Sequence, residues 1–315
     1  MNILIVGASG NLGSLLTKHL LSTQHHLRLL THRRNLPFDL PEKANAEIVR
    51  GDLDDRASLR TVCENIDCIV YLAGVLFRPR PERFLHRTNT VYVQNILHAA
   101  VPAGVKKFIL VSFPHVEENT TPENPAKGLL DAEPKSIHAR TRLEAEKFLF
   151  HACEGRTITP IVLRAGVIYG REVKLIKAAR WLMRRRLMAI WRNPTWLHLL
   201  ALPDFLHIVR IVLDKESLSG IYNLCDDQPV LLQDFVDRLA THWGYPAPWR
   251  LPASAFYAVA LLGETFATIF HTATPLTRDM VRMGMTSVVA DTSRLKQEIV
   301  ATLTYPALDT GIHVI

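Results

Sequence analysis

The segment that most constrains the fold of this chain is its beginning, MNILIVGASGNLG. A continuous apolar run at 2–6 is followed by a G-x-x-G-x-x-G turn at Gly7, Gly10 and Gly13. Residues 12–23 then have the apolar spacing of a helix. An apolar run that ends in glycine is typical of a strand buried on both faces of a parallel sheet. The segment therefore predicts a strand, a tight turn and a helix, in that order.

The same alternation continues through the first half of the chain. Apolar runs predict further strands at 26–31, 46–53, 66–74, 106–112 and 158–166. Helical periodicity occurs near 56–64, 88–102 and 138–153. Repeated strand–helix–strand units require a parallel sheet with helices on both faces. We therefore predict an α/β protein with a Rossmann-type, doubly wound sheet.

The pattern changes after Gly170. Residues 171–192 contain eight Lys or Arg residues and a single Glu. A strand at 219–225 and an amphipathic helix at 231–244 follow. We predict a dinucleotide-type domain formed by 1–165 and 205–243. A smaller substrate or lid domain would comprise 166–204 and 244–315.

Residues 253–270 form an apolar segment whose single charge is Glu264. The segment approaches the length of a membrane span, but its Gly, Glu, Ser and Thr residues make it a weak one. We expect a buried or dimer-forming helix. A helix that lies on a membrane surface is the alternative.

Composition excludes few classes of protein. Of the 315 residues, 48% are apolar and 21% are charged, and the formal net charge is +7. This charge favours anionic partners but is too small to indicate nucleic acid. Trp181, Trp191 and Trp196 lie among the cations and suit a lid, an acidic-lipid contact or a partner surface.

The four cysteines, at 63, 68, 153 and 225, form no C-x-x-C pair and no zinc-ligand spacing with histidine. We therefore expect no metal site and predict buried, reduced thiols. The chain starts directly with an apolar strand pattern and no signal peptide. These features predict a cytoplasmic protein, and the apolar segment leaves membrane association open.

The glycine turn predicts a binding site for a dinucleotide. Glycines allow the backbone to approach a pyrophosphate, and the helix N-terminus supplies free N–H groups and the positive end of its dipole. A tight turn without ligand is the alternative. The candidate contact residues in this turn are Gly7, Ser9, Gly10, Asn11, Leu12 and Gly13.

The end of the second predicted strand bears on which dinucleotide binds. An Asp or Glu at this position would bind the 2′-hydroxyl of an unphosphorylated adenosine ribose. In this chain Thr31 is followed instead by His32, Arg33 and Arg34. Two arginines suit a 2′-phosphate, so we predict NADP(H), with NAD(H) and a solvated basic loop as alternatives. Asp52, followed by Leu53, is expected beside the adenine amino group.

Together these residues resemble the extended and atypical short-chain dehydrogenase/reductase superfamily, which includes nucleotide-sugar epimerases and dehydratases. The motifs span nearly the whole chain: GASGNLG, GDLDD, YLAG, NTVYVQNILHAA, KKFILVS, LEAEKFL, VLRAGVIYG, GIYNLCDDQPVLLQDFVDRLA and DTSRLKQEI. The resemblance implies a Rossmann domain and a small C-terminal domain that closes over the substrate. It also implies that Leu72, Ala73 and Gly74 pass beside the cofactor. Ala165, Gly166 and Val167 would face the nicotinamide.

The resemblance also locates three departures from the family pattern. The family uses a Tyr, a Lys four residues later and a Ser after the fifth strand. Here His138 and Arg142 occupy the first two positions, and Pro114 the third, with Ser112 two residues earlier. Arg142 would bind ribose hydroxyls or phosphate. His138 would carry the proton, or serve in binding or structure. His115 is a possible substitute for the serine, although a surface loop histidine is the expected reading.

Three further arginines, Arg78, Arg80 and Arg83, follow the fourth predicted strand, where the resemblance places the cofactor border. They suit an anionic substrate or the cofactor phosphates, and a solvated loop is an equal alternative.

Two functions are compatible with these features. The first is an NADP(H)-binding oxidoreductase or epimerase/dehydratase-like enzyme that acts on a small carbonyl or alcohol, with His138 and Arg142 in the active site. The second is a non-catalytic NADP(H)-binding sensor or assembly protein, similar to an accessory subunit of respiratory complex I. No feature of the sequence identifies the substrate, and nucleic acid is not an expected partner.

Overall fold

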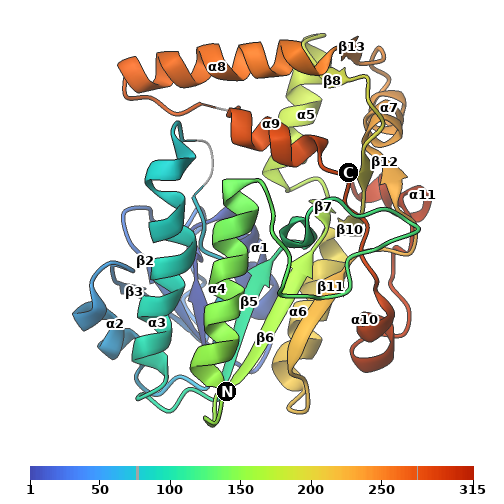
Figure 1. Cartoon of the computed structure of the whole chain (residues 1–315). Helices are drawn as coiled ribbons and strands as arrows, with labels where there is room; N and C mark the ends of the chain where they lie inside the picture. The colour runs from blue at the N-terminus through green and yellow to red at the C-terminus, as the bar shows by residue number, and fades with distance from the viewer. Residues whose placement is uncertain (76–77, 275) are drawn as a thin grey trace.

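A seven-stranded parallel sheet forms the centre of the computed structural model, which describes residues 1–75, 78–274 and 276–315 (Figure 1). The strand order is β11-β6-β5-β4-β1-β2-β3. The strands are β1 (Asn2–Val6), β2 (His26–Thr31), β3 (Ala46–Arg50), β4 (Cys68–Tyr71), β5 (Lys107–Ser112), β6 (Thr159–Ala165) and β11 (Gly220–Leu224). The predicted Rossmann-type sheet is confirmed.

The apolar run of β1 reflects burial on both faces of the sheet. Ile3 and Ile5 belong to the core on one face, and Leu4 and Val6 to the core on the other. Alternate residues of a strand point to opposite faces, so a central strand needs apolar side chains at every position. The helices α1 (Asn11–Leu20) and α6 (Leu202–Asp214) contribute to the first core. The second is covered by α2 (Arg56–Cys63), α3 (Tyr92–Ala100) and α4 (Ile137–Cys153).

Among the described residues of the first half of the chain are three short connecting helices. They are η1 (Pro81–Arg83), the π-helical η2 (His86–Val91) and η3 (Pro114–Glu117). The π-helical turn runs directly into α3, so the helix predicted at 88–102 has a wider first turn than expected.

The second half adds small two-stranded sheets and helices beyond one end of the main sheet (Figure 1). The strands pair as β7 (Val167–Tyr169) with β10 (Leu199–Ala201), β8 (Ala189–Trp191) with β13 (Trp249–Leu251), and β9 (Trp196–Leu197) with β12 (Val230–Leu231). The helices are α5 (Lys174–Arg184), α7 (Leu232–His242), α8 (Ala253–Ile269), α9 (Arg278–Met285), α10 (Ser293–Glu298), α11 (Leu308–Gly311) and η4 (Ile312–Val314).

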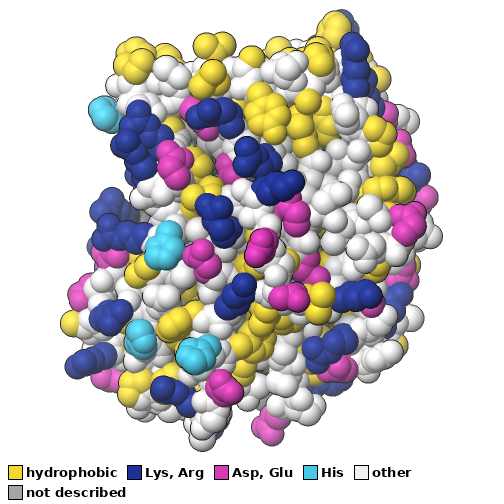
Figure 2. All heavy atoms as spheres, in the orientation of Figure 1, with side chains coloured by type: hydrophobic (Ala, Val, Ile, Leu, Met, Phe, Trp, Pro, Cys, Tyr) yellow, Lys and Arg dark blue, Asp and Glu magenta, His cyan; other side chains and the backbone are white. Residues whose placement is uncertain are grey.

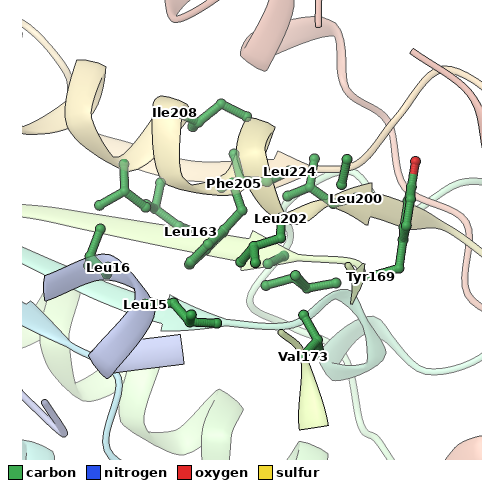
Figure 3. Close-up of a cluster of buried hydrophobic side chains, with 14 of the residues drawn as sticks. Leu15, Leu16, Leu163, Tyr169, Val173, Leu200, Leu202, Phe205, Ile208 and Leu224 are labelled. Atoms are coloured by element: carbon green, nitrogen blue, oxygen red, sulfur yellow. The ribbon is translucent and has the colours of Figure 1, made fainter. Parts of the chain in front are cut away.

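One apolar cluster connects these additions to the main sheet. Leu15 and Leu16 of α1, Leu163 of β6 and Phe205 of α6 pack in the same cluster as Tyr169 of β7 (Figure 3). The two parts of the proposed division into domains, at 165/166, 204/205 and 243/244, share this core. The division itself remains a prediction. Crossing a bilayer would demand a longer or more uniformly apolar helix than any in the described part of the chain.

Candidate functional site

The turn between β1 and α1 requires glycine at two positions. Gly7 has a φ of +97°, and a Cβ added to it would lie 2.8 Å from the backbone nitrogen of Ala73. A Cβ on Gly13 would lie 2.1 Å from the carbonyl oxygen of Gly7. Backbone atoms cannot yield to such contacts, so these glycines allow the turn to pass close to itself and to the end of β4.

The N-terminus of α1 offers unused hydrogen-bond donors. No side chain caps the helix at Gly10, and its first turn contains no acidic residue. Within the described residues, the backbone N–H groups of Asn11, Leu12 and Gly13 donate no hydrogen bond. Such an N-terminus favours an anion through its N–H groups and its dipole. The turn therefore fits a pyrophosphate group.

The side chain of Asn11 has a different role. Its Nδ2 donates to the carbonyl of Glu172 at 3.1 Å, and its Oδ1 accepts from the N–H of Lys174 at 2.7 Å. Asn11 thus ties the turn to the start of α5, and only its backbone remains available to a ligand. Ser9 and Leu12 are half-buried beside it.

The end of β2 presents cations to solvent. Thr31 is buried, whereas His32, Arg33 and Arg34 are exposed. Arg33 Nε lies 3.1 Å from His32 Nε2, which in turn lies 3.8 Å from Asp52 Oδ2. No carboxylate occupies the tip of this strand, where a hydrogen bond to an unphosphorylated ribose would need one.

Asp52 and Leu53 belong to the turn after β3. Asp52 Oδ1 accepts from the backbone N–H of Asp54 at 3.0 Å, and the carbonyl of Leu53 accepts from Asn95 Nδ2 at 2.8 Å. The turn is therefore fixed by hydrogen bonds of its own. It ends the strand at Arg50, three residues before the predicted end.

Arg142 of α4 reaches the segment that follows β4. Its Nη2 lies 3.4 Å from the carbonyl oxygen of Ala73 and beside Gly74. The residue is only 6% exposed, yet its Nε and Nη1 have no hydrogen-bond partner among the described residues. Burial lowers the pKa of Arg142. A buried guanidinium with unused donors is unfavourable by itself and fits a polar or anionic ligand.

His138 forms a pair with Asp279 of α9. Its Nδ1 lies 2.8 Å from Asp279 Oδ2, and its Nε2 is buried with no partner among the described residues. Asp279 also accepts from Ser136 Oγ at 3.0 Å and from the N–H groups of Ile137 and His138 at 3.0 and 3.3 Å. One carboxylate therefore caps α4 and orients the imidazole.

The contacts of Asp279 also affect its protonation. Burial raises its pKa, but the hydrogen bonds from His138 and Ile137 outweigh burial, so the pKa of Asp279 is lowered. Sequence reasoning missed this residue, which lies 141 positions from His138. The only local signal was a carboxylate in the first turn of a short helix, and that signal is common.

Ser112 is held in a buried polar network. Its hydroxyl donates to Glu146 Oε1, while Arg164 donates to Glu146 Oε2 through Nε at 3.1 Å and Nη2 at 2.6 Å. Arg164 is fully buried and also donates to Glu117. The network joins β5, β6, α4 and η3, so the Ser112 hydroxyl serves the packing of these elements.

Pro114 and His115 follow β5, and the expectation for His115 needs correction. Pro114 is the buried first residue of η3, at the position of the family serine. His115 was expected in a surface loop, and that expectation was wrong. It is half-buried on η3, with its ring 5.9 Å from that of Phe113, and burial lowers its pKa to about 4.

The segment expected at the nicotinamide is tightly packed. Ala165 is buried at the end of β6, and Val167 pairs with Leu199. A Cβ on Gly166 would lie 2.3 Å from the carbonyl oxygen of His198 and 2.9 Å from Cys225 Sγ. Only glycine fits between β7, β10 and the loop after β11.

The remaining cationic and aromatic candidates do not converge on one surface. Arg78, Arg80 and Arg83 are exposed, and Arg78 lies over the ring of Phe84 at 5.7 Å. Trp181 is exposed, but Trp191 is buried and donates to Thr195 Oγ1 at 2.8 Å. Trp191 therefore packs in the core, which excludes it from a lid surface.

An open hollow of about 540 Å³ lies near the start of α4. Its lining residues are Glu118, Asn119, Lys135, Tyr257, Arg282, Met285 and Thr286. Lys135 precedes α4, and Arg282 lies on α9, the helix that carries Asp279. The hollow therefore adjoins the helices that bring His138 and Asp279 together.

The sheet order, the glycine turn and the uncapped α1 N-terminus define a Rossmann protein with a site for a dinucleotide. Residues 3–210 match the model of the NAD dependent epimerase/dehydratase family. The match covers more than half of the chain, which belongs to this family and, through it, to the extended short-chain dehydrogenase/reductase superfamily.

One curated relative and several solved structures are similar to the chain over most of its length. Human sterol-4-alpha-carboxylate 3-dehydrogenase (decarboxylating) is 23% identical over 263 residues, 78% of this chain and 67% of that protein. A dTDP-glucose 4,6-dehydratase from Streptomyces venezuelae, solved with NAD, has a TM-score of 0.78 at 16% identity. The two chains are covered to 99% and 94%.

A UDP-glucose 4-epimerase from Thermotoga maritima, solved with UDP-glucose, is also similar. Its TM-score is 0.75 at 18% identity, with 100% of this chain and 97% of that chain covered. At such identities the structural comparisons establish the fold. The family match indicates a cofactor of the NAD type.

Proposed function

We propose that this protein is an NADP(H)-dependent oxidoreductase or epimerase/dehydratase-like enzyme that acts on a small carbonyl or alcohol. The observation that carries the proposal is the His138–Asp279 pair, one helical turn from a buried Arg142 that borders Ala73 and Gly74. An imidazole oriented by a carboxylate on Nδ1 presents Nε2 as a proton acceptor or donor.

Each side chain of the site then has a distinct task. The turn at Gly7 to Gly13 holds the pyrophosphate, and Arg142 binds the ribose hydroxyls through its unused N–H groups. A bound nicotinamide supplies hydride transfer. His138 moves one proton at Nε2, while Asp279 fixes the orientation of the ring through Nδ1. Arg142 remains protonated and takes no part in proton transfer.

The choice of NADP(H) over NAD(H) rests on Arg33 and Arg34. Both side chains are exposed past the end of β2, where the 2′-phosphate of NADP(H) would lie. NAD(H) is the alternative, because NAD is the cofactor named with the family and with the solved dehydratase. Of the three charged residues at the open hollow, Lys135 and Arg282 are cations and Glu118 is an anion, and the excess of positive charge supports a substrate that carries negative charge.

The cytoplasm is a reducing compartment, and we propose that the protein acts there. All four cysteines are free and buried, as is usual where disulfides do not form.

Turnover of two variants tests the proton role. We expect His138→Gln to lower kcat by about 10²- to 10⁴-fold while it spares NADPH affinity. Asp279→Asn should also lower kcat, but less, because it weakens the contact that orients the His138 ring. The measurement is NADPH fluorescence with a panel of aldehydes and ketones, beside calorimetric titration of NADPH.

His151→Gln is the matched control, since His151 lies on the same helix with an 84% exposed side chain. It should leave both kcat and affinity unchanged. If His138→Gln turns over substrate as fast as the unaltered protein, His138 is not the proton carrier.

A non-catalytic NADP(H)-binding sensor or assembly protein is the second candidate. The observation in its favour is that His138, Arg142 and Pro114 replace the Tyr, Lys and Ser of the family pattern. Binding of NADPH without oxidation by any carbonyl compound in the panel would favour this candidate, and affinity purification would then seek its partner.

A further inference from the structure

The outward face of α8 is apolar from Val259 to the C-cap residue Phe270. Val259, Leu262, Phe266, Ile269 and Phe270 are between 57% and 70% exposed. Their spacing places them on one side of the helix. The residues of α8 that are buried are small or polar: Ala260, Glu264 and Ala267. The expectation of a buried helix was therefore wrong, because α8 packs on the protein through short side chains.

The single charge of α8 points toward the protein. Glu264 is 8% exposed, accepts from the N–H of Arg278 at 2.9 Å and pairs with its Nε at 2.7 Å. A surface helix ordinarily turns its charges to water and its apolar side chains inward. The reverse arrangement on α8 indicates a nonpolar medium or partner on the outside.

Cations and further exposed apolar side chains adjoin the N-terminal end of α8. The last residue of α5 and the turn after it carry Arg184, Arg185, Arg186 and Leu187, all exposed. It is joined to β13 by a hydrogen bond from Trp249 Nε1 to the carbonyl of Arg186 at 3.1 Å. β13 runs into α8, and its Trp249 is 64% exposed. Arg192, also exposed, donates its N–H to the carbonyl of Leu251 at 3.1 Å.

These segments lie together at one end of the molecule. In Figure 1, α8 crosses the top, with β8 and β13 at its right-hand end. Figure 2 shows hydrophobic side chains along this upper edge and dark blue cationic side chains toward the right. We call this surface the α8 face: residues 184–187, 192, 249–251 and the outward side of 259–270.

We propose that the α8 face docks on a lipid bilayer that contains anionic lipids. Apolar side chains would enter the boundary between headgroups and acyl chains, Trp249 would sit at headgroup level, and the arginines would contact anionic headgroups. A second copy of the chain complements this face poorly. A two-fold contact sets a surface against itself, and the residues of the α8 face include no exposed carboxylate to meet Arg184, Arg185, Arg186 and Arg192. Within the described residues these four arginines form no ion pair, whereas Arg250 pairs with Asp237.

Flotation with lipid vesicles tests the proposal on the whole protein. We expect it to float with phosphatidylcholine vesicles that contain phosphatidylglycerol, and far less with phosphatidylcholine alone. Leu262→Glu combined with Phe266→Glu should abolish flotation. Arg184→Gln combined with Arg185→Gln should weaken binding about thirtyfold. The controls are Ile48→Glu, at a 51% exposed residue of the edge strand β3, and Arg60→Gln combined with Arg156→Gln.

A second measurement needs no variant of α8. Brominated lipids should quench the tryptophan fluorescence of the unaltered protein, and Trp249→Phe should remove part of that quenching. Absence of both flotation and quenching overturns the proposal. A shift from dimer to monomer by light scattering in the Leu262→Glu, Phe266→Glu variant, without vesicle binding by the unaltered protein, assigns the face to a second copy instead.

Discussion

Two buried ionisable residues outside the candidate site, Lys107 and Asp226, differ in how their polar atoms are satisfied. Lys107 donates to the carbonyls of Val212, Leu213 and Lys215, and so caps the end of α6. Asp226 is fully buried, and its Oδ2 has no hydrogen-bond partner among the described residues. Burial raises the pKa of Asp226 to about 8, and burial lowers the pKa of the neighbouring His198 to about 4. Near neutral pH the two are thus a neutral pair.

Asp226→Asn should make the protein less sensitive to pH. The folded-state pKa of Asp226 lies above the unfolded value of about 4. Between about pH 4 and pH 8 the native state therefore keeps a proton that the unfolded chain has already lost. Stability therefore falls as pH rises through this range, by up to roughly 1 kcal/mol per pH unit. The asparagine variant lacks this loss, so its advantage in Tm should grow from pH 5 to pH 8.

Thermal unfolding followed by circular dichroism measures this difference. Asp131→Asn, at an exposed carboxylate, is the control. An advantage in Tm that stays constant across the pH range would contradict a protonated Asp226.

Among the elements, α4 organises the candidate site. Its N-terminus holds His138 and is capped by Asp279, and one turn later Arg142 reaches Ala73. One further turn along, Glu146 binds Ser112 and Arg164. The spacing of four residues puts all three on one side of the helix, facing the carboxyl ends of β4, β5 and β6. Loss of one partner from the Arg164–Glu146 pair would leave a buried charge uncompensated.

The turn before α1 gives an element-scale prediction. We expect Gly13→Ala to lower NADPH affinity by at least about tenfold and to reduce Tm, because its Cβ would meet the Gly7 carbonyl oxygen. Gly104→Ala is the control, since a Cβ there meets nothing within 4 Å at a φ of +76°. It should reduce Tm alone. Calorimetric titration separates the two, and normal affinity in Gly13→Ala would argue against the turn as the phosphate site.

At the scale of the whole molecule, cofactor binding should stabilise the chain. A ligand at 100 times its Kd adds about 2.7 kcal/mol to the free energy of unfolding. We expect NADPH to raise Tm more than NADH at equal concentration. Arg33→Ala combined with Arg34→Ala should remove the difference, because the 2′-phosphate loses its cationic partners.

Arg60→Ala combined with Arg156→Ala, at exposed positions distant in sequence from the turn, controls for net charge. A larger shift with NADH than with NADPH would reverse the cofactor assignment.

The sequence by itself determined the sheet and the glycine turn between β1 and α1. Alternating burial on β1 and the sterics of Gly7 and Gly13 are local, so they appear as an apolar run and a glycine spacing. The positions of His138 and Arg142 on one helix face were likewise readable from a four-residue spacing.

Only the tertiary structure decided which groups meet these elements. Asp279 reaches His138 across 141 positions, and Glu117, Glu146 and Ser112 converge around Arg164 from separate segments. The orientation of α8 was also undetermined, because a nearly all-apolar helix has no polar side to fix its rotation. Packing through Ala260 and Ala267 and the Glu264–Arg278 pair set that rotation, and they left the large apolar side chains outside.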